Sequence, residues 1–143
     1  MHWNSKLSMG FGFGGLLFSL LLFGLPEASA QDASKGRDIF IVQCLSCHAF
    51  SCNKEGPRLG GLFGRKAASV EDYDWRSYYS QDLKDSGIVW VEESLDAWFE
   101  DPAKFAPTSV MADNGRVEDA EQRKHLIAFL RTEDPTVNLC PQE

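Results

Sequence analysis

The sequence lacks the features of several protein classes. It has no excess of basic residues, since 21 Asp and Glu outnumber 14 Lys and Arg and give a formal net charge of −7. This acidic balance argues against a nucleic-acid-binding protein. Internal repeats and low-complexity tracts are also absent. Charged residues make up 24% and hydrophobic residues 43% of the chain, which excludes the disordered, collagenous and coiled-coil classes. The 143 residues suffice for one domain but not for two.

Signals for β-strands are scarce, whereas three segments have helical periodicity. In residues 35–47, four residues would lie on one helix face and deliver two sulfur atoms to the same side: Gly36, Phe40, Cys44 and Cys47. A second segment follows Trp90 and is stopped by Pro102, with its apolar residues at Leu95, Trp98 and Phe99. The third segment is 118–131, with its apolar residues at Leu126, Ile127, Phe129 and Leu130. We therefore predict an all-α domain of three short helices and long loops, with little core unless a large group fills its centre.

Residues 1–30 have the pattern of a secretory signal peptide. A polar start that contains Lys6 precedes the apolar stretch 7–25, and Ala28-Ser29-Ala30 provides a small-x-small cleavage pattern. The apolar stretch is long enough to span a bilayer, but five glycines and Pro26 favour a cleaved leader over a retained anchor, which is the alternative. We expect cleavage after Ala30. Residues 31–143 then form the mature domain in the periplasm, an oxidising compartment, and they contain all four cysteines.

The motif Cys44-Leu45-Ser46-Cys47-His48 is the attachment pattern of a c-type haem. Two thiols at positions i and i+3 of a helix can both add to the vinyl groups of one haem and form thioethers. The adjacent His48 then lies beneath the iron and supplies an imidazole nitrogen as ligand. The motif therefore predicts one covalently bound haem c per chain, held through Cys44 and Cys47.

Three other chemistries are compatible with parts of this motif. A zinc site has the required residue types in Cys44, Cys47, His48 and Cys52, although all four lie within nine residues. A thioredoxin-like redox dithiol would need a βαβ setting, which the sequence does not offer. A structural disulfide between Cys44 and Cys47 would leave His48 without a role. We therefore favour haem attachment.

Further segments extend this interpretation along the chain. They are Gly36-x-x-Ile39-Phe40, Gly56-Pro57-x-Leu59-x-Gly61-Leu62-Phe63-Gly64-Arg65-Lys66, Tyr79-Ser80, Ser86-Gly87-Ile88-Val89-Trp90, Asp101-Pro102-x-Lys104-Phe105-x-Pro107 and Leu126-Ile127-Ala128-Phe129-Leu130. With these segments, nearly all of residues 35–131 resembles the soluble class I cytochromes c of mitochondria and bacteria. The resemblance implies the class I cytochrome c fold, in which three main helices and long loops wrap around a covalently bound haem. It also implies that the first and last helices cross at Gly36, Phe40, Leu126 and Phe129.

The sixth ligand of the iron separates an electron carrier, in which the position is occupied, from a gas-binding or peroxidase-like protein, in which it is open. Met111 is the only methionine after residue 30 and follows Pro107-Thr108-Ser109-Val110. The resemblance implies an axial thioether there, on a loop between the second and last helices. An unliganded Met that fills a core gap is the alternative. His125 in a helix and His2 in the leader are poor competitors, so the resemblance predicts ligation by His48 and Met111.

The resemblance also assigns polar residues around the haem. Pro57 matches a proline whose carbonyl accepts the N–H of the haem-ligating imidazole, with a plain Gly-Pro turn as the alternative. Arg65 matches a cation near the haem propionates, which need such partners when buried. Three residues match donors to a propionate: Tyr79, Trp90 and Ser109. Trp98 stands where many relatives have a tyrosine near the Met ligand, so a hydroxyl-to-sulfur hydrogen bond is unavailable here.

Haem attachment leaves two cysteines, Cys52 and Cys140. In an oxidising compartment we expect them to form a disulfide. The resemblance supports this, because in the class I fold the last helix packs across the first and brings the tail back near the haem-attachment loop. Closing the chain between them contributes at most about 4–5 kcal/mol by the chain-entropy estimate. Two free thiols or an intermolecular bridge are the alternatives.

These features together predict a periplasmic one-electron carrier rather than an enzyme. It would take an electron from a membrane oxidoreductase complex or a periplasmic dehydrogenase and pass it to an oxidase or reductase. We expect a monomer with redox proteins as partners and no nucleic acid. One alternative is a dedicated cytochrome subunit of one dehydrogenase. Another is a haem enzyme with an open distal site, which depends on Met111.

Surface charge bears on the partner. Many relatives surround the exposed haem edge with lysines, whereas here three of those positions are Gln43, Ala103 and Val110. Lys104 is present, and Asp113 follows the Met ligand by two residues. We expect such an acidic carrier to be steered towards basic or neutral partner surfaces. A largely apolar docking patch, for which charge is irrelevant, is the alternative.

Overall fold

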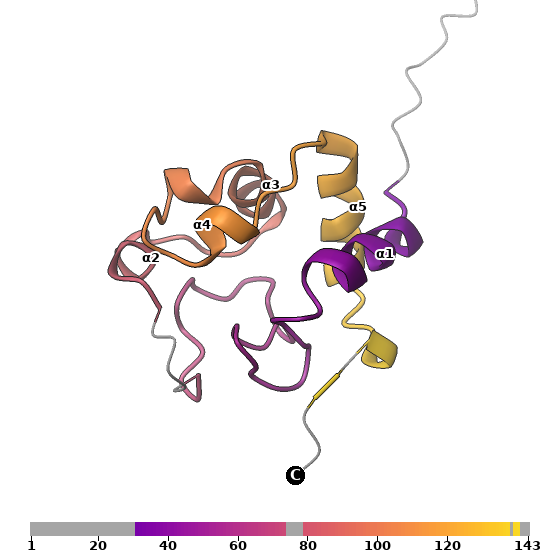
Figure 1. Cartoon of the computed structure of the whole chain (residues 1–143), viewed down its shortest axis with the longest axis horizontal. Helices are drawn as coiled ribbons and strands as arrows, with labels where there is room; N and C mark the ends of the chain where they lie inside the picture. Colours follow the sequence, from indigo (N-terminus) through magenta and orange to yellow (C-terminus); the bar gives the residue numbers. More distant parts are fainter. Residues whose placement is uncertain (1–30, 74–78, 138, 141–143) are drawn as a thin grey trace, which may run out of the picture.

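The computed structural model describes residues 31–73, 79–137, 139 and 140, so the predicted leader lies outside the described residues. Within these ranges the chain forms α-helices and 3-10 turns (Figure 1) in the order α1 (Ala33–Gln43), α2 (Gln81–Asp85), α3 (Glu92–Glu100), η1 (Pro102–Lys104), α4 (Met111–Asn114), α5 (Ala120–Leu130) and η2 (Pro135–Val137). The described residues contain no β-strand, and Lys66 and Val89 form an isolated antiparallel bridge. The predicted all-α class is confirmed.

Local capping sets where the three main helices start. The Asp32 carboxylate accepts a hydrogen bond from a backbone N–H in the first turn of α1, at 2.9 Å. The Asp119 carboxylate does the same for α5, at 2.8 Å. In α3 the Ser94 hydroxyl accepts the backbone N–H of Val91, at 2.9 Å. The helices predicted after Trp90 and over 118–131 are therefore present, and the last is slightly shorter at both ends.

The first helix ends earlier than the sequence predicts. α1 stops at Gln43, whereas the periodicity extends it to Cys47. At this end the backbone N–H groups of Cys44 and Leu45 both donate to the carbonyl of Phe40, each at 2.9 Å, so regular α-helical pairing does not continue. The N–H of Cys47 then donates to the carbonyl of Cys44 in a tight turn. Both thiols are consequently presented by a turn and not by a helix face.

α1 and α5 pack across each other, side by side in Figure 1. A Cβ added to Gly36 would collide with the backbone carbonyl of His125, so this close approach requires glycine. The rings of Phe40, Phe50 and Phe129 pack with centroids 5.3 to 5.8 Å apart. The predicted crossing is confirmed, and its buried members are Gly36, Phe40, Leu126 and Phe129.

The sequence does not predict the two short helices α2 and α4. Asp82 of α2 accepts hydrogen bonds from the backbone N–H and the hydroxyl of Thr108, at 2.8 and 3.0 Å, and thereby joins α2 to the segment before α4. Met111 opens α4, whereas the sequence places it on a loop without helical structure. Helices of this length do not form alone, so tertiary contacts must hold them. In the described part of the chain, no helix combines the length and the apolar character required to cross a bilayer.

Candidate haem site

A cavity of about 730 Å³ lies between the turn after α1, the loops that follow it and the residues around α4. Its volume falls in the range of about 300–1,000 Å³ that is usual for small-molecule and cofactor sites. The fold brings to this one cavity all nine residues that the sequence assigns to cofactor binding: Cys44, Cys47, His48, Pro57, Arg65, Tyr79, Trp90, Ser109 and Met111.

His48 is held in one orientation at the cavity wall. It is 9% exposed, and its Nδ1 lies 2.8 Å from the carbonyl oxygen of Pro57. Because a carbonyl only accepts, we assign the proton to Nδ1, and Nε2 then offers a lone pair when the ring is neutral. Burial lowers the pKa of His48 and favours this neutral form. Gly56 packs on the same ring, since a Cβ there would collide with the imidazole.

Cys44 and Cys47 line the cavity as free thiols. Burial, reinforced by the neighbouring Cys47, raises the pKa of Cys44 to about 12, so its thiol is neutral. Cys47 is exposed, and the Ser46 hydroxyl lies 3.6 Å from its sulfur atom. The two sulfur atoms are not bonded to each other, which contradicts the alternative of a structural disulfide within the motif.

Met111 reaches the cavity from the start of α4. Its backbone N–H donates to the Ser109 hydroxyl at 3.2 Å. A Cβ on Gly115 would lie 2.6 Å from the Met111 Cε, so glycine leaves room for the end of the thioether side chain. Met111 and His48 thus approach the same cavity from distant parts of the sequence.

Polar residues at the cavity suit an anionic group of a ligand. Arg65 donates to the backbone carbonyls of Gly60 and Arg58, at 2.8 and 2.9 Å, which fixes its guanidinium at the cavity wall. Burial lowers the pKa of Arg65, but a guanidinium remains a cation. Burial also raises the pKa of Tyr79, so its hydroxyl stays protonated and can donate.

Aromatic residues close another part of the cavity. The Trp90 and Trp98 rings meet edge to face with centroids 5.4 Å apart, and both are buried. Such walls exclude water from a bound group. Two thiols, an oriented imidazole, a thioether and a cation among apolar residues fit a haem, which presents vinyl groups, iron and propionates to these partners.

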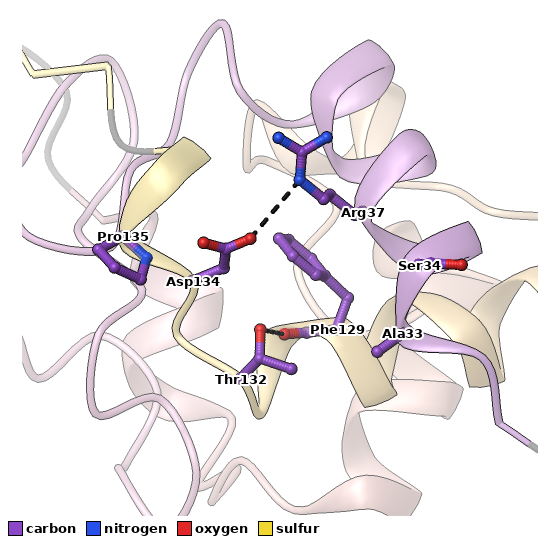
Figure 2. A pocket seen from close by; sticks show the side chains of 7 residues that line it. All are labelled: Ala33, Ser34, Arg37, Phe129, Thr132, Asp134 and Pro135. Atoms are coloured by element: carbon purple, nitrogen blue, oxygen red, sulfur yellow. Dashed lines mark hydrogen bonds and ion pairs between the residues drawn. The ribbon is translucent and has the colours of Figure 1, made fainter.

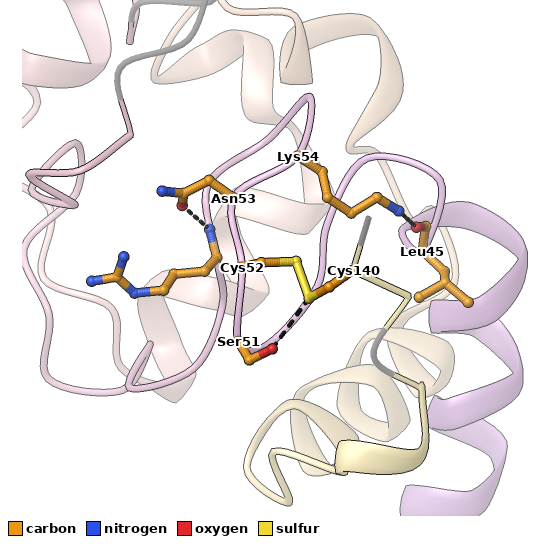
Figure 3. The surroundings of a disulfide bond; sticks show 7 residues. Leu45, Ser51, Cys52, Asn53, Lys54 and Cys140 are labelled. Atoms are coloured by element: carbon orange, nitrogen blue, oxygen red, sulfur yellow. Dashed lines mark hydrogen bonds between the residues drawn. A yellow bond between two sulfur atoms is a disulfide. The ribbon is translucent and has the colours of Figure 1, made fainter. Parts of the chain in front are cut away.

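The zinc alternative is contradicted by the structure. Cys52 forms a disulfide with Cys140 (Figure 3) and does not join the other three residues. Within the described ranges, no group of three or more His, Cys, Asp or Glu side chains is arranged to hold a metal ion. His125 does not line the cavity, and its Nδ1 accepts the backbone N–H of Asp32 at 2.9 Å. His2 lies outside the described residues.

The cavity also has lining residues that the sequence analysis does not assign, among them Tyr73, Asn114 and Gly115. Gly115 has a sequence signal, because it lies four residues after Met111 and so on the same side of a helical turn. Tyr73 has none, since its position depends on the loop, where its hydroxyl donates to the carbonyl of Glu55 at 2.5 Å.

The sequence and the structure were compared with those of known proteins. No family model matches the chain. Cytochrome c of Arabidopsis thaliana is 39% identical over 105 residues, which cover 71% of this chain and 89% of that protein. Cytochrome c2 of Blastochloris viridis is 37% identical over 121 residues, with coverages of 81% and 91%. Among solved structures, cytochrome cH from Methylobacterium extorquens has a TM-score of 0.60 at 36% identity, covering 71% of this chain and 98% of its own.

These relatives match the chain over most of their own length. The similarity is therefore a likeness of whole domains and not of an isolated motif. The chain belongs to the class I c-type cytochromes, which bind haem c covalently, exchange electrons with redox partners, and act as electron carriers rather than as enzymes.

Proposed function

We propose that this chain is an exported, periplasmic one-electron carrier whose haem is bonded to Cys44 and Cys47 and ligated by His48 and Met111. The observation that carries the proposal is the convergence of these four side chains on one cavity, with the imidazole already oriented by Pro57. Relatives named cytochrome c2 and cytochrome cH support a carrier of this kind in bacteria.

The haem, when bound, supplies the iron that gains and loses one electron. Nε2 of His48 and the thioether of Met111 would hold the iron in both oxidation states, so no ligand would have to be exchanged. A thioether favours the electron-rich ferrous state and raises the reduction potential. The hydrogen bond from His48 to Pro57 fixes the imidazole and tunes its basicity.

Polar residues of the cavity limit the cost of burying the propionates. We assign this role to the Arg65 cation and to three donors, Tyr79, Trp90 and Ser109. Trp98 closes the apolar wall where it would contact the haem. Water exclusion by this wall also favours the less charged, reduced haem.

The remaining parts of the proposal concern export. Residues 1–30 act as the leader, with cleavage after Ala30, and residues 31–143 are the mature cytochrome domain. In the oxidising periplasm Cys52 and Cys140 form an intramolecular disulfide. The pairing of their sulfur atoms, with Cα atoms 6.0 Å apart, supports this bridge. Thiol titration of the denatured, unreduced holoprotein tests it, since two free thiols per chain would contradict the bridge.

The test of His48 and Met111 ligation is spectroscopic. The ferric protein should show the weak red absorption of iron–thioether bonding, and Met111→Ala should lose it and bind carbon monoxide when reduced. Val110→Ala, at the adjacent exposed residue, is the matched control and should behave like the unchanged protein. If the unchanged, reduced protein bound carbon monoxide readily, an open-site haem enzyme would be favoured instead.

A further inference from the structure

The chain that follows α5 lies against the loop that orients His48. Residues 131–137 turn away from α5 and pass through η2, where Val137 is 4% exposed. Cys140 lies beside the loop, bonded to Cys52. We call residues 131–137, 139 and 140 the tail. The tail is therefore part of the folded domain, with Val137 buried in its interior.

Contacts along its length attach the tail to the rest of the domain, beginning with the ion pair between Arg131 and Glu92 of α3 at 3.0 Å. Asp134 pairs with Arg37 of α1, Oδ2 to Nε at 3.5 Å, across a pocket of about 380 Å³ (Figure 2). The Oε1 atom of Glu133 accepts the backbone N–H of Gly61 at 2.7 Å. Cys140 is bonded to Cys52 (Figure 3). The last two contacts are both made to the loop that follows His48.

Two segments of that loop, residues 47–50 and 56–60, lie side by side in the same order, and we call it the doubled loop. The backbone N–H of Gly56 donates to the carbonyl of Cys47, that of Leu59 to Ala49 and that of Gly60 to Phe50, each at 2.8 Å. Cys52 lies in the connection between the two segments, Pro57, which accepts from His48, lies within the second segment, and Gly61 follows it. The tail is therefore attached to the loop on both sides of Pro57 in the sequence.

Glu133 has a backbone conformation that calls for an explanation. Its φ is +48°, a left-handed value that costs a non-glycine residue about 1–2 kcal/mol. Helices commonly end with glycine, or sometimes asparagine, in this conformation. A glutamate persists there only if its side chain gains something elsewhere. The Glu133 carboxylate accepts the hydrogen bond from Gly61 and is also attracted electrostatically to Arg65.

We propose that Glu133 is a positioning residue for the haem ligand His48: its carboxylate, together with the Cys52–Cys140 bridge, holds the doubled loop so that the Pro57 carbonyl keeps the imidazole oriented. This inference rests on the ligation by His48 that is proposed above. It assigns a role in electron transfer to a residue outside the cavity lining.

Two variants of the holoprotein separate this role from simple helix termination. Glu133→Gly removes the carboxylate but relieves the backbone strain, so a residue that only ends α5 should tolerate it or stabilise the protein. Glu133→Gln removes the same charge but keeps an acceptor oxygen for the Gly61 N–H. Any effect of charge alone is common to both variants, and any effect of the hydrogen bond is confined to Glu133→Gly.

Hydrogen exchange in the reduced holoprotein is the first measurement. Glu133→Gly should speed exchange of the amides of Leu59, Gly60 and Gly61 and of the His48 Nδ1–H about tenfold, because losing a bond of about 1.4 kcal/mol changes an opening equilibrium by that factor. Exchange at the amide of Arg131, the residue that caps α5 and donates to Ile127, should not increase. Glu133→Gln should restore most of the protection.

The reduction potential is the second measurement. A looser bond to Pro57 makes the imidazole a weaker donor to the iron, so the potential of Glu133→Gly should lie above that of Glu133→Gln. Unchanged loop exchange in Glu133→Gly, or a potential equal to or below that of Glu133→Gln, would overturn the inference. Failure of the ligation proposal would show separately, as a missing iron–thioether absorption or as haem that is not covalently bound in the unchanged protein.

Discussion

Gly56 leaves room for the imidazole of His48, because a Cβ at this position would collide with the ring. We expect Gly56→Ala to destabilise the holoprotein by about 2–3 kcal/mol, since the ring is buried and cannot move away without losing its bond to Pro57. Gly87→Ala is the control. Gly87 has φ +68° and no atom within 4 Å of an added Cβ, so only backbone strain of about 1 kcal/mol is expected there. Denaturant unfolding measures both, and equal losses would contradict a special role of Gly56.

The protonation of Asp82 should affect the segment that leads to Met111, because Asp82 accepts hydrogen bonds from Thr108. The neighbouring Ser80 hydroxyl and the N–H and hydroxyl of Thr108 lower the pKa of Asp82 to about 2. A lowered carboxyl pKa stabilises the folded state above the ordinary pKa of 3.8 and loses that effect as the pH falls towards 2. We therefore expect the iron–thioether absorption to be lost between pH 4 and 2.

The matching variant is Asp82→Asn, which cannot titrate. Its absorption should be weaker already at neutral pH and should change less over the acid range. Asp85→Asn, in the same helix but without a bond to Thr108, should keep the normal acid profile. An identical profile in Asp82→Asn and the unchanged protein would show that Asp82 does not hold this segment.

Single residues differ in how far the sequence predicts them. The Cys44, Cys47 and His48 assignment follows from a local motif, and the remaining predicted positions follow from ordered resemblance along the chain. Tyr73 and Asp82 are harder to assign, because their contacts to Glu55 and Thr108 arise only after folding. Residue spacing predicts a site whose residues are close together in the sequence, whereas contacts between distant segments are not visible in the local sequence.

Between helices, Arg123 is the main polar contact of α5 with α3. It is 6% exposed and donates to Asp96 of α3 at 2.7 Å and to the carbonyls of Val117 and Glu118 at 3.1 and 2.9 Å. We expect Arg123→Leu to destabilise the protein by about 2–3 kcal/mol, because the buried Val117 carbonyl would lose its partner and the Asp96 carboxylate its ion pair.

Lys124→Leu is the adjacent control. Lys124 is exposed and pairs with Glu121 one turn away on α5, at 2.6 Å. Exposed pairs of this kind contribute at most about 0.5 kcal/mol. Thermal or denaturant unfolding of the two holoproteins measures the difference, and a similar effect of both substitutions would contradict the role assigned to Arg123.

The helices themselves show where periodicity is informative. α3 and α5 have regular apolar spacing and side-chain caps at or near their first turns, and they lie where the sequence predicts them. The apolar spacing of α1 continues past its end, because the Cys44 to Cys47 turn keeps a similar side facing inwards. α2 and α4 escape prediction, since a helix of four or five residues depends on contacts such as that between Asp82 and Thr108.

Taken as a whole, the molecule carries net negative charge, and its expected docking side has little positive charge. Val110 is 74% exposed, and Gln43, Ala103 and Asp113 are exposed as well. We expect slow electron transfer to an acidic partner surface, with rates that rise as salt screens the repulsion. With a basic partner, salt should slow the reaction.

Electron-transfer rates measured across ionic strength with acidic and basic partners test this expectation. Asp113→Asn should weaken the salt dependence. Glu71 is another exposed acidic residue, and Glu71→Gln controls for net charge alone. A flat profile would favour an apolar docking patch around Ala103 and Val110. Faster transfer to an acidic partner at low salt would contradict the charge argument.

The Cys52–Cys140 bridge also has a consequence for biogenesis. Four thiols can pair into disulfides in more than one way, and Cys44 and Cys47 leave that competition only once they are bonded to haem. If the chain is exported as proposed, haem attachment and thiol oxidation are rival reactions. A cell short of haem should accumulate cross-bridged apoprotein that haem can no longer enter, so the order of maturation decides how much working carrier is made.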